Sequence, residues 1–285
     1  MQPGLMQRVI TWIGVAVLLV WSLGPIYWTL VSSVTPSADF SLRPINFFPR
    51  EFTFNHFLRL LGINVERIGG VLVWEQFRVA LFNSVATSLL ATVFCVAIAA
   101  LGGYAFARLD FPGKRVVFLV VVATLAIPGY AVLIPLYRLM ISLKWIDTYL
   151  GITLIYVSAY LPLTLWLMRS VFDSLPVSLE EAAQLDGAGR LRIFFSIVLP
   201  LVGPGLTAAA ILTFLGAWGQ YLVPLVFSPK VTKPLTVLIP EFVTKNFIDY
   251  GLITASGTIA ILIPALVVIF LNRYLVTGLL AGSVK

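Results

Sequence analysis

The chain has 285 residues, of which 60% are hydrophobic and only 11% are charged. A soluble domain carries roughly 25% charged residues, so this composition excludes an ordinary water-soluble protein and indicates a surface that lies largely in lipid. The formal net charge of +7 comes from scattered Lys and Arg, which suits anionic headgroups and gives no support for nucleic-acid binding. With one cysteine and one histidine, the chain has no internal disulfide and no basis for a histidine metal centre.

Uncharged runs long enough to cross a bilayer recur six times along the chain. One helical crossing needs about 20 apolar residues, and an isolated strand would leave its backbone polar groups unpaired in lipid. We therefore expect an all-α integral membrane protein with one transmembrane domain over 1–285. The first run exceeds the apolar part of a signal peptide, so we expect it to remain as an anchor. The six expected spans are approximately 9–34, 80–107, 116–138, 148–170, 200–227 and 251–273.

The segments between and within these runs carry further signals. The long first loop, 39–78, is rich in Phe, Asn and Arg and predicts a small ordered cap. Prolines occur in five of the six runs and predict kinks or helix ends there. The pair Gly102-Gly103 could loosen the second run. The excess of Lys and Arg per loop residue weakly favours both termini in the cytoplasm.

The six uncharged runs, which contain no Asp, Glu, Lys, Arg or His, are 9–38, 79–107, 116–137, 148–168, 193–229 and 250–272. Ion-coupled transporters need an ionisable residue at membrane depth, and intramembrane enzymes need a nucleophile and base or a metal pair there, so both classes are disfavoured. The Gly113-Lys114 pair lacks the upstream glycine of a phosphate-binding loop. If the chain transports a solute, we expect it to bind no cofactor itself, with ATP and Mg²⁺ held by a separate ATPase.

One loop, 173–192, is rich in charged residues, whereas the chain as a whole has few of them. Ser178 followed by Glu181 has the spacing of a capping box and predicts a helix of about two turns. Gly187 predicts the end of that helix, and a second helix is expected near Gly189. Judged by local physics alone, an amphipathic helix lying on lipid headgroups explains this pattern at least as well as a docking element.

The spacing of the same loop is more specific. Glu-Ala-Ala, three residues, Gly, nine residues, Ile, one residue, Leu-Pro resembles the loop motif of permeases of binding-protein-dependent ABC importers. The stretches "GYAFARLDFPGK", "IPLYRLM" and "NRYLVTGLLAGSVK" are similar to the carbohydrate branch of that family. "FPREFTFNHF", with the long first loop, is similar to the smaller permease subunit of maltodextrin importers, the MalG type.

The resemblance implies a type I ABC importer fold, six spans with a cytoplasmic coupling helix, in the inner membrane of a bacterium or archaeon. It implies alternating access without an active site in this chain. In that family the motif helix docks on a cytoplasmic ATPase, both termini then being cytoplasmic. The coupling residues implied are Glu180, Glu181, Ala182, Ala183, Asp186, Gly187, Ile197, Leu199 and Pro200, with Gly278, Gly282 and Lys285 of the tail also reaching the ATPase.

The implied partners are a second homologous permease subunit forming a heterodimer, two ATPase subunits, an extracytoplasmic sugar-binding protein and membrane lipid. The implied cargo is maltose, maltodextrin or a related oligosaccharide. Permeases for trehalose, other oligosaccharides or glycerol 3-phosphate are alternatives, and an ATP-independent secondary transporter is a more distant one.

The stretch "GAWGQYLVP", 216–224, is the best candidate lining of a substrate path. Trp218 and Tyr221 could stack on a sugar face, and Gln220 could hydrogen-bond its hydroxyls. Glycines for helix packing beside an interfacial aromatic belt explain the stretch equally well.

Overall fold

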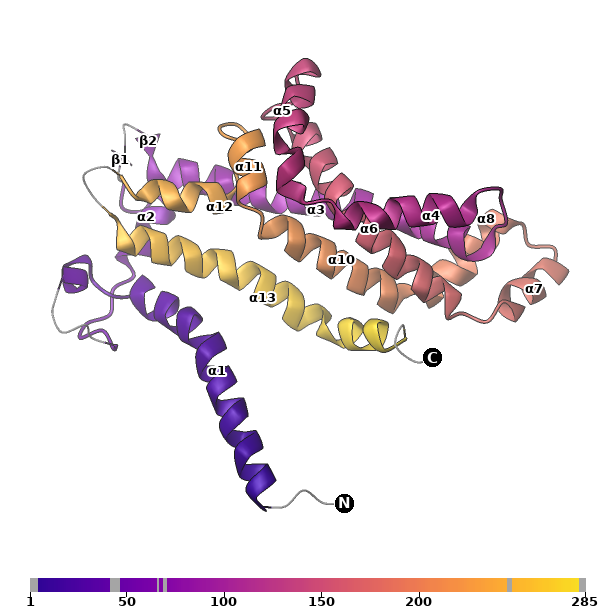
Figure 1. Cartoon of the computed structure of the whole chain (residues 1–285). Coiled ribbons are helices and arrows are strands. Elements are labelled where there is room, and N and C mark those ends of the chain that lie inside the picture. Colours follow the sequence, from indigo (N-terminus) through magenta and orange to yellow (C-terminus); the bar gives the residue numbers. More distant parts are fainter. Residues whose placement is uncertain (1–4, 42–46, 66, 69–70, 245–247, 282–285) are drawn as a thin grey trace. The chain divides into compact units, whose positions relative to one another are not determined.

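A computed structural model describes the chain apart from residues 1–4, 42–46, 66, 69–70, 245–247 and 282–285 (Figure 1). The described chain is helical except for loops and one antiparallel pair of two-residue strands. It divides into two compact units. The first contains Met1–Val79 and Leu238–Leu262, and the second contains Ala80–Val237 and Ile263–Lys285.

The first unit includes the cap that the long first loop predicts. Arg59 and Asp249 form a largely buried ion pair, and the buried His56 places its Nε2 atom 2.9 Å from the carbonyl oxygen of Thr35. The unit begins with the apolar helix α1, Leu5–Ser33. Its other elements are a 3₁₀ turn Ser37–Ser41, α2 Asn55–Leu60, β1 Arg67–Ile68, β2 Val71–Leu72, a 3₁₀ turn Ile239–Phe242 and the starts of α3 and α13.

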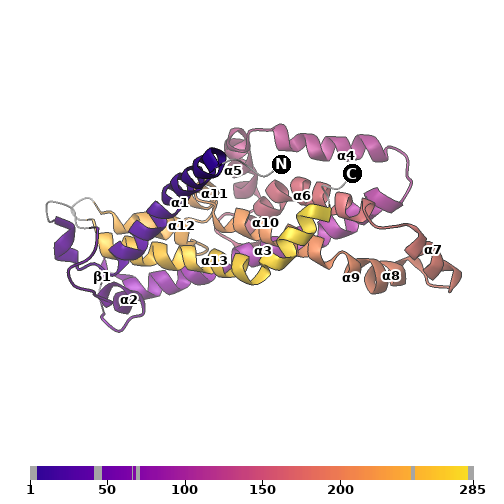
Figure 2. The same cartoon turned by 90° about the horizontal axis from the view of Figure 1, so that it is seen from below.

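The second unit is a helical bundle in which α6 packs along α10 and α3 (Figures 1 and 2). In both views α7 lies at one end of this unit, beyond the end of α6. The helices are α3 Val73–Arg108, α4 Lys114–Ala123, α5 Leu133–Ser142, α6 Tyr149–Asp173, α7 Ser178–Leu185, α8 Arg190–Ile193, α9 Leu199–Leu201, α10 Gly203–Trp218, α11 Leu222–Phe227, α12 Leu235–Leu238 and α13 Tyr250–Ala281, with 3₁₀ turns Thr124–Ala126 and Gly129–Val132 and a π segment Phe194–Val198.

Four helices among the described residues are long and apolar enough to cross a bilayer. Two further pairs, Lys114–Ala126 with Gly129–Ser142 and Arg190–Leu201 with Gly203–Trp218, are bent by 94° and 75°. If each bent pair is one broken span, the number rises to six, so the count of six spans remains a prediction. The four single-helix candidates are Met6–Ser33, Val73–Arg108, Tyr149–Asp173 and Tyr250–Leu271.

Prolines mark both breaks. Ile127 is extended (φ −76°, ψ 124°) because the ring of Pro128 disfavours a helical residue before it, and the helix stops there. Pro204 lies in the first turn of α10, where its missing N–H is tolerated. The helices α1, α6 and α13, in contrast, continue past internal prolines at 25, 162 and 264.

The expectation that Gly102-Gly103 loosens the second run is wrong, because α3 continues through both glycines. They instead let α6 approach closely. A Cβ on Gly103 would lie 2.9 Å from the Cβ of Met168 and 3.0 Å from the backbone nitrogen of Arg169. A Cβ on Gly102 would meet one flexible atom, the Cδ1 of Leu165, at 2.8 Å. The glycines therefore serve packing rather than bending.

Asp147 fixes the loop after α11. Its carboxylate accepts hydrogen bonds from the backbone N–H groups of Val231 (2.9 Å) and Thr232 (3.0 Å), from the Thr232 hydroxyl (3.1 Å) and from the Lys230 N–H (3.4 Å). Burial alone would raise the pKa of Asp147, but these hydrogen bonds together lower it below the ordinary value.

This lowered pKa predicts a pH-dependent loop. A depressed carboxyl pKa gives stability that is complete above the unfolded value of about 3.9 and is lost as pH falls through the lower folded value. We expect Asp147→Asn to speed exchange of the Val231 and Thr232 amides at neutral pH, corresponding to about 1–3 kcal/mol of lost protection. Hydrogen exchange in detergent checks this, with the exposed Asp110→Asn as control. A difference between Asp147→Asn and wild type that persists undiminished below the folded pKa would contradict it.

Candidate functional site

The charged loop 173–192 folds into a short helix, a tight turn and a second helix. The N–H of Ala188 donates to the carbonyl of Ala183, and the N–H of Gly187 donates to that of Gln184, both at 2.9 Å. This pair of bonds is a Schellman motif, which needs a left-handed residue, and Gly187 has φ +79°. The predicted helix end is therefore confirmed, and α8 begins at Arg190 as expected.

The predicted capping box is wrong. Ser178 is the first helical residue of α7 rather than its cap, and no side chain caps this end. Val177 takes the cap position with helical angles (φ −64°, ψ −27°), and its carbonyl accepts the N–H groups of Glu180 and Glu181. The two glutamates still lie in the first turn, where negative charge complements the helix dipole.

The helix α7 has a buried face and an exposed face. Glu180 and Ala183, three residues apart, share the buried face, with exposed fractions of 5% and 9%. Glu181 and Ala182 of the motif are exposed, and so are Asp186 and Gly187. The Glu-Ala-Ala motif is thus divided, because its first two residues are open to a partner while Ala183 packs into the core of this unit.

Glu180 is held by a hydrogen-bond network that the sequence patterns do not predict. The Nε of Arg108 donates to Glu180 Oε1 at 2.6 Å, and the hydroxyl of Tyr104 donates to Oε2 at 2.7 Å. The Nη2 of Arg108 also donates to the carbonyls of Phe172 and Leu175, each at 2.8 Å. We call these three side chains, Tyr104, Arg108 and Glu180, the clamp.

The clamp joins three elements at one end of the unit. Tyr104 and Arg108 lie one turn apart at the end of α3, and the two carbonyls belong to the last turn of α6 and the residues after it. A cation at a helix C-terminus satisfies carbonyls that have no partner within the helix. The ring of Tyr104 packs edge-on to Phe172 and against Phe194, with centroids 5.6 and 4.9 Å apart. The available signal was the spacing of Tyr and Arg in "GYAFAR", which places both on one helix face.

The later motif residues line the entry to α10. Ile197 and Leu199 are partly buried against the core, whereas Pro200 is exposed. Ile197 lies within the π segment Phe194–Val198, which directly precedes Leu199 and Pro200, and both π segments and prolines are recognised causes of helix kinks. On the α6 side the packing is tight, since a Cβ on Gly205 would lie 2.6 Å from Val171.

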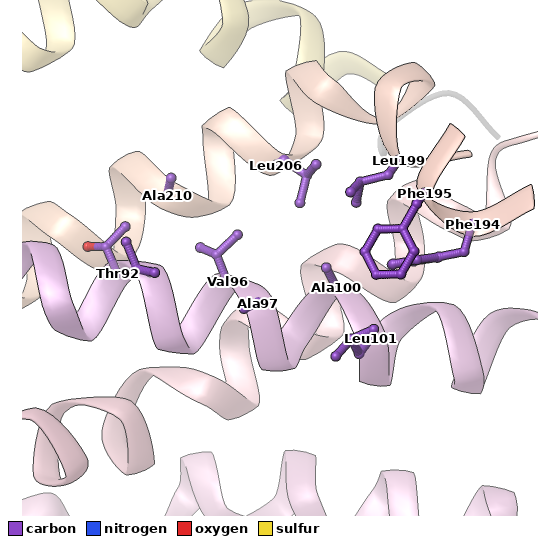
Figure 3. Close-up of a pocket in the computed structure, with 11 residues that line it drawn as sticks. Thr92, Val96, Ala97, Ala100, Leu101, Phe194, Phe195, Leu199, Leu206 and Ala210 are labelled. Carbon is purple, nitrogen blue, oxygen red and sulfur yellow. The ribbon is translucent and has the colours of Figure 1, made fainter. Parts of the chain in front are cut away.

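Towards α3 the same entry leaves an apolar cavity of about 410 Å³ (Figure 3). Leu199 and Phe195 project from one wall, and small α3 residues such as Ala100 form the other. The motif residue Leu199 therefore faces open apolar space on this side. The lining residues are Thr92, Val93, Val96, Ala97, Ala100, Leu101, Phe194, Phe195, Leu199, Leu206 and Ala210.

The expected substrate-path residues are in different settings. Trp218 is buried and stacks on Phe214 with ring centroids 5.7 Å apart. The side-chain nitrogen of Gln220 donates to the Tyr160 hydroxyl at 2.6 Å, and Tyr221 is 44% exposed. Of the predicted tail residues, Gly278 lies in α13, while Gly282 and Lys285 lie outside the described residues.

The relatives that cover most of the chain include two transport permeases. The osmoprotective compounds uptake permease protein GgtD of Synechocystis is 36% identical, with 81% of this chain and 78% of that protein covered. The trehalose/maltose transport system permease protein MalG of Thermococcus litoralis is 28% identical over 100% of this chain and 99% of that protein.

The fold is shared with a solved ABC transporter. A chain of the crystal structure of a bacterial ABC transporter involved in the import of the acidic polysaccharide alginate superposes with a TM-score of 0.78. It covers 95% of this chain and 98% of its own length at 22% identity. Residues 96–280, which include the charged loop and the clamp residues Tyr104, Arg108 and Glu180, match a family described as the binding-protein-dependent transport system inner membrane component. Because this match covers more than half of the chain, the protein belongs to that family.

Proposed function

We propose that the chain is a permease subunit of an ATP-driven carbohydrate importer, and that α7 is its coupling helix. The observation that carries this proposal is the two-sided α7 within a chain of this family. One face carries exposed Glu181 and Ala182 of the motif, and the other is anchored to the ends of α3 and α6 through Glu180. A headgroup-bound helix needs no such polar anchor, so this arrangement favours a coupling role over the lipid-surface alternative.

The exposed face suits a protein partner. Leu185, the last residue of α7, is 90% exposed, and Leu191, in the following α8, is 75% exposed; both lie among charged residues. An exposed apolar patch rimmed by polar residues marks a site of interaction with a protein or a membrane. We propose that this face docks on a cytoplasmic ATPase, which holds ATP and Mg²⁺ and performs the hydrolysis. Gly187 shapes the turn that ends the docking helix, and the tail residues Gly278, Gly282 and Lys285 contribute to the same interface.

The family and the fold support the remaining partners. We propose a heterodimer with a second, homologous permease subunit, two ATPase subunits and an extracytoplasmic sugar-binding protein. Docking of α7 on a cytoplasmic ATPase places both termini in the cytoplasm. ATP-driven movement of α7 then switches the spans between outward-facing and inward-facing states.

We propose a neutral oligosaccharide of the maltose or trehalose type as cargo. The full-length likeness to a trehalose/maltose permease and the absence of ionisable side chains from the six uncharged runs support this choice. The exposed Tyr221 supports the substrate-path role better than Trp218 or Gln220, which are engaged within the unit. The likeness to an osmoprotectant permease makes small osmoprotectants the rival cargo.

The test is co-expression of the chain with its genomic neighbours, purification in mild detergent and reconstitution into vesicles. We expect a second permease and an ATPase to co-elute, and ATP to drive uptake of labelled maltose or trehalose. Preference for an osmoprotective compound that is not a sugar would replace the sugar assignment and keep the importer. A chain that elutes alone and transports without ATP would overturn the proposed function.

A further inference from the structure

We infer that Tyr104, Arg108 and Glu180 are positioning residues that transmit the movement of α7 to α3 and α6. This inference rests on the proposed function, because it requires α7 to be driven by an ATPase. It assigns to the first glutamate of the Glu-Glu-Ala-Ala stretch an inward role, distinct from the outward role of Glu181.

The way α7 is attached points to the clamp. Of its eight residues, Glu180 and Ala183 are the buried ones. The single methyl group of Ala183 sets how closely α7 approaches the core, but it makes no directional bond. The carboxylate of Glu180 accepts two short hydrogen bonds, at 2.6 and 2.7 Å, from two side chains of α3. Charge-assisted bonds of this kind are directional and strong where water is excluded, and the Glu180 and Arg108 side chains are only 7% and 10% exposed.

The connections on either side of α7 are too flexible to hold it rigidly, so the hydrogen bonds of Glu180 are needed to fix its orientation. Residues 174–177 join α6 to α7, and residues 186–189, which include Gly187 and Gly189, join α7 to α8. A short loop on one side and a two-glycine turn on the other would let a displaced α7 pivot. The clamp prevents this pivoting because it hydrogen-bonds the first turn of α7 to α3.

Arg108 extends the tie to α6. Its guanidinium holds Glu180 through Nε while Nη2 bonds the carbonyls of Phe172 and Leu175, so one rigid planar group fixes three elements. A lysine carries a single charged nitrogen and cannot reach these three acceptors in the same geometry. Displacement of α7 therefore moves the ends of α3 and α6 together, instead of being absorbed by the loop.

The experiment uses the reconstituted complex with its ATPase and binding protein. The variants are Arg108→Lys, Glu180→Gln and Tyr104→Phe. The last is the mildest, because it removes one hydroxyl and keeps the ring packing. The control is Asp110→Asn, which changes an exposed carboxylate near the clamp. ATPase co-purification, basal ATP hydrolysis, and its stimulation by binding protein loaded with maltose or trehalose are measured. We expect docking and basal hydrolysis to persist, while stimulation falls about tenfold for Arg108→Lys and Glu180→Gln and less for Tyr104→Phe.

Loss of stimulation with unchanged docking and basal hydrolysis distinguishes residues that transmit the movement of α7 from residues that only stabilise the fold. A merely structural role would lower yield, docking and basal hydrolysis together, and that result would overturn the inference. Stimulation equal to wild type in all three variants would overturn it as well, while leaving the proposed function intact. If only a binding protein loaded with an osmoprotective compound stimulates the wild-type complex, the sugar assignment fails and the variants are compared with that ligand. If no loaded binding protein stimulates the wild-type complex, the proposed function fails, and the inference fails with it.

Discussion

Glu181→Lys is expected to leave the protein folded in the membrane and to reduce ATP-driven transport strongly. Glu181 is exposed on the docking face of α7, so its replacement leaves the clamp and the core unchanged. At a protein interface, reversing a charge removes a favourable contact and places an ammonium group where a carboxylate is complementary. We expect ATP-driven uptake to fall about 10- to 100-fold. This fall lies within the roughly 5- to 150-fold effects that typical coupling free energies between two sites produce.

The measurement is ATP-driven sugar uptake in vesicles alongside the amount of ATPase that co-purifies. Asp110→Lys is the matched control, because it makes the same change of charge at an exposed carboxylate outside α7. Lysine in the first turn of a helix also opposes the dipole, but that term is only about 0.3–1 kcal/mol. Normal uptake by Glu181→Lys would refute the role of α7 as the coupling helix.

Gly103→Ala is expected to destabilise the protein more than Gly102→Ala. The new Cβ at 103 would meet the Cβ of Met168 and the backbone nitrogen of Arg169 at 2.9–3.0 Å, and backbone atoms of a long helix cannot yield locally. The Cβ at 102 would meet only the end of the Leu165 side chain, which can rotate. Overpacking a core typically costs about 1–3 kcal/mol, so we expect that range at 103 and a smaller cost at 102.

Thermal unfolding in detergent measures this difference. Gly203→Ala is the control for the substitution itself, because nothing lies within 4 Å of a Cβ at that position in α10. Equal melting temperatures for the variants at 102 and 103 would contradict the close approach of α3 and α6. Since Tyr104 and Arg108 follow directly along α3, we also expect Gly103→Ala to weaken sugar-stimulated ATP hydrolysis.

The parts of the site that follow from local rules were predictable from the sequence. The length of α7, its end at Gly187 and the start of α8 near Gly189 depend on helix propensity and on the left-handed preference of glycine, which act within a few residues. The helical fold followed from the apolar runs. The capping box failed because Val177 already has helical angles, which draws Ser178 into the first turn.

The clamp was not predictable by the same reasoning. Arg108 and Glu180 are 72 residues apart, and their contact depends on how α3 packs against α6. Sequence alone shows Arg108 as one more basic loop residue and Glu180 as part of an exposed motif. The two glycines of α3 gave a similar ambiguity, since a glycine pair suits either a flexible point or a close contact, and the packing partner decides which.

The most direct test of the account is cross-linking between α7 and the ATPase. Ala182→Cys places a thiol on the exposed face of α7, and Cys95 is fully buried and so does not compete. In purified complexes, we predict that a short bifunctional thiol reagent links Ala182→Cys to an ATPase that carries surface cysteines, and that Ser142→Cys, at the exposed end of α5, stays unlinked. Linking at Ala182 would confirm α7 as the coupling helix. No linking at Ala182 while the ATPase remains bound would contradict it and leave α7 as a helix on the lipid surface.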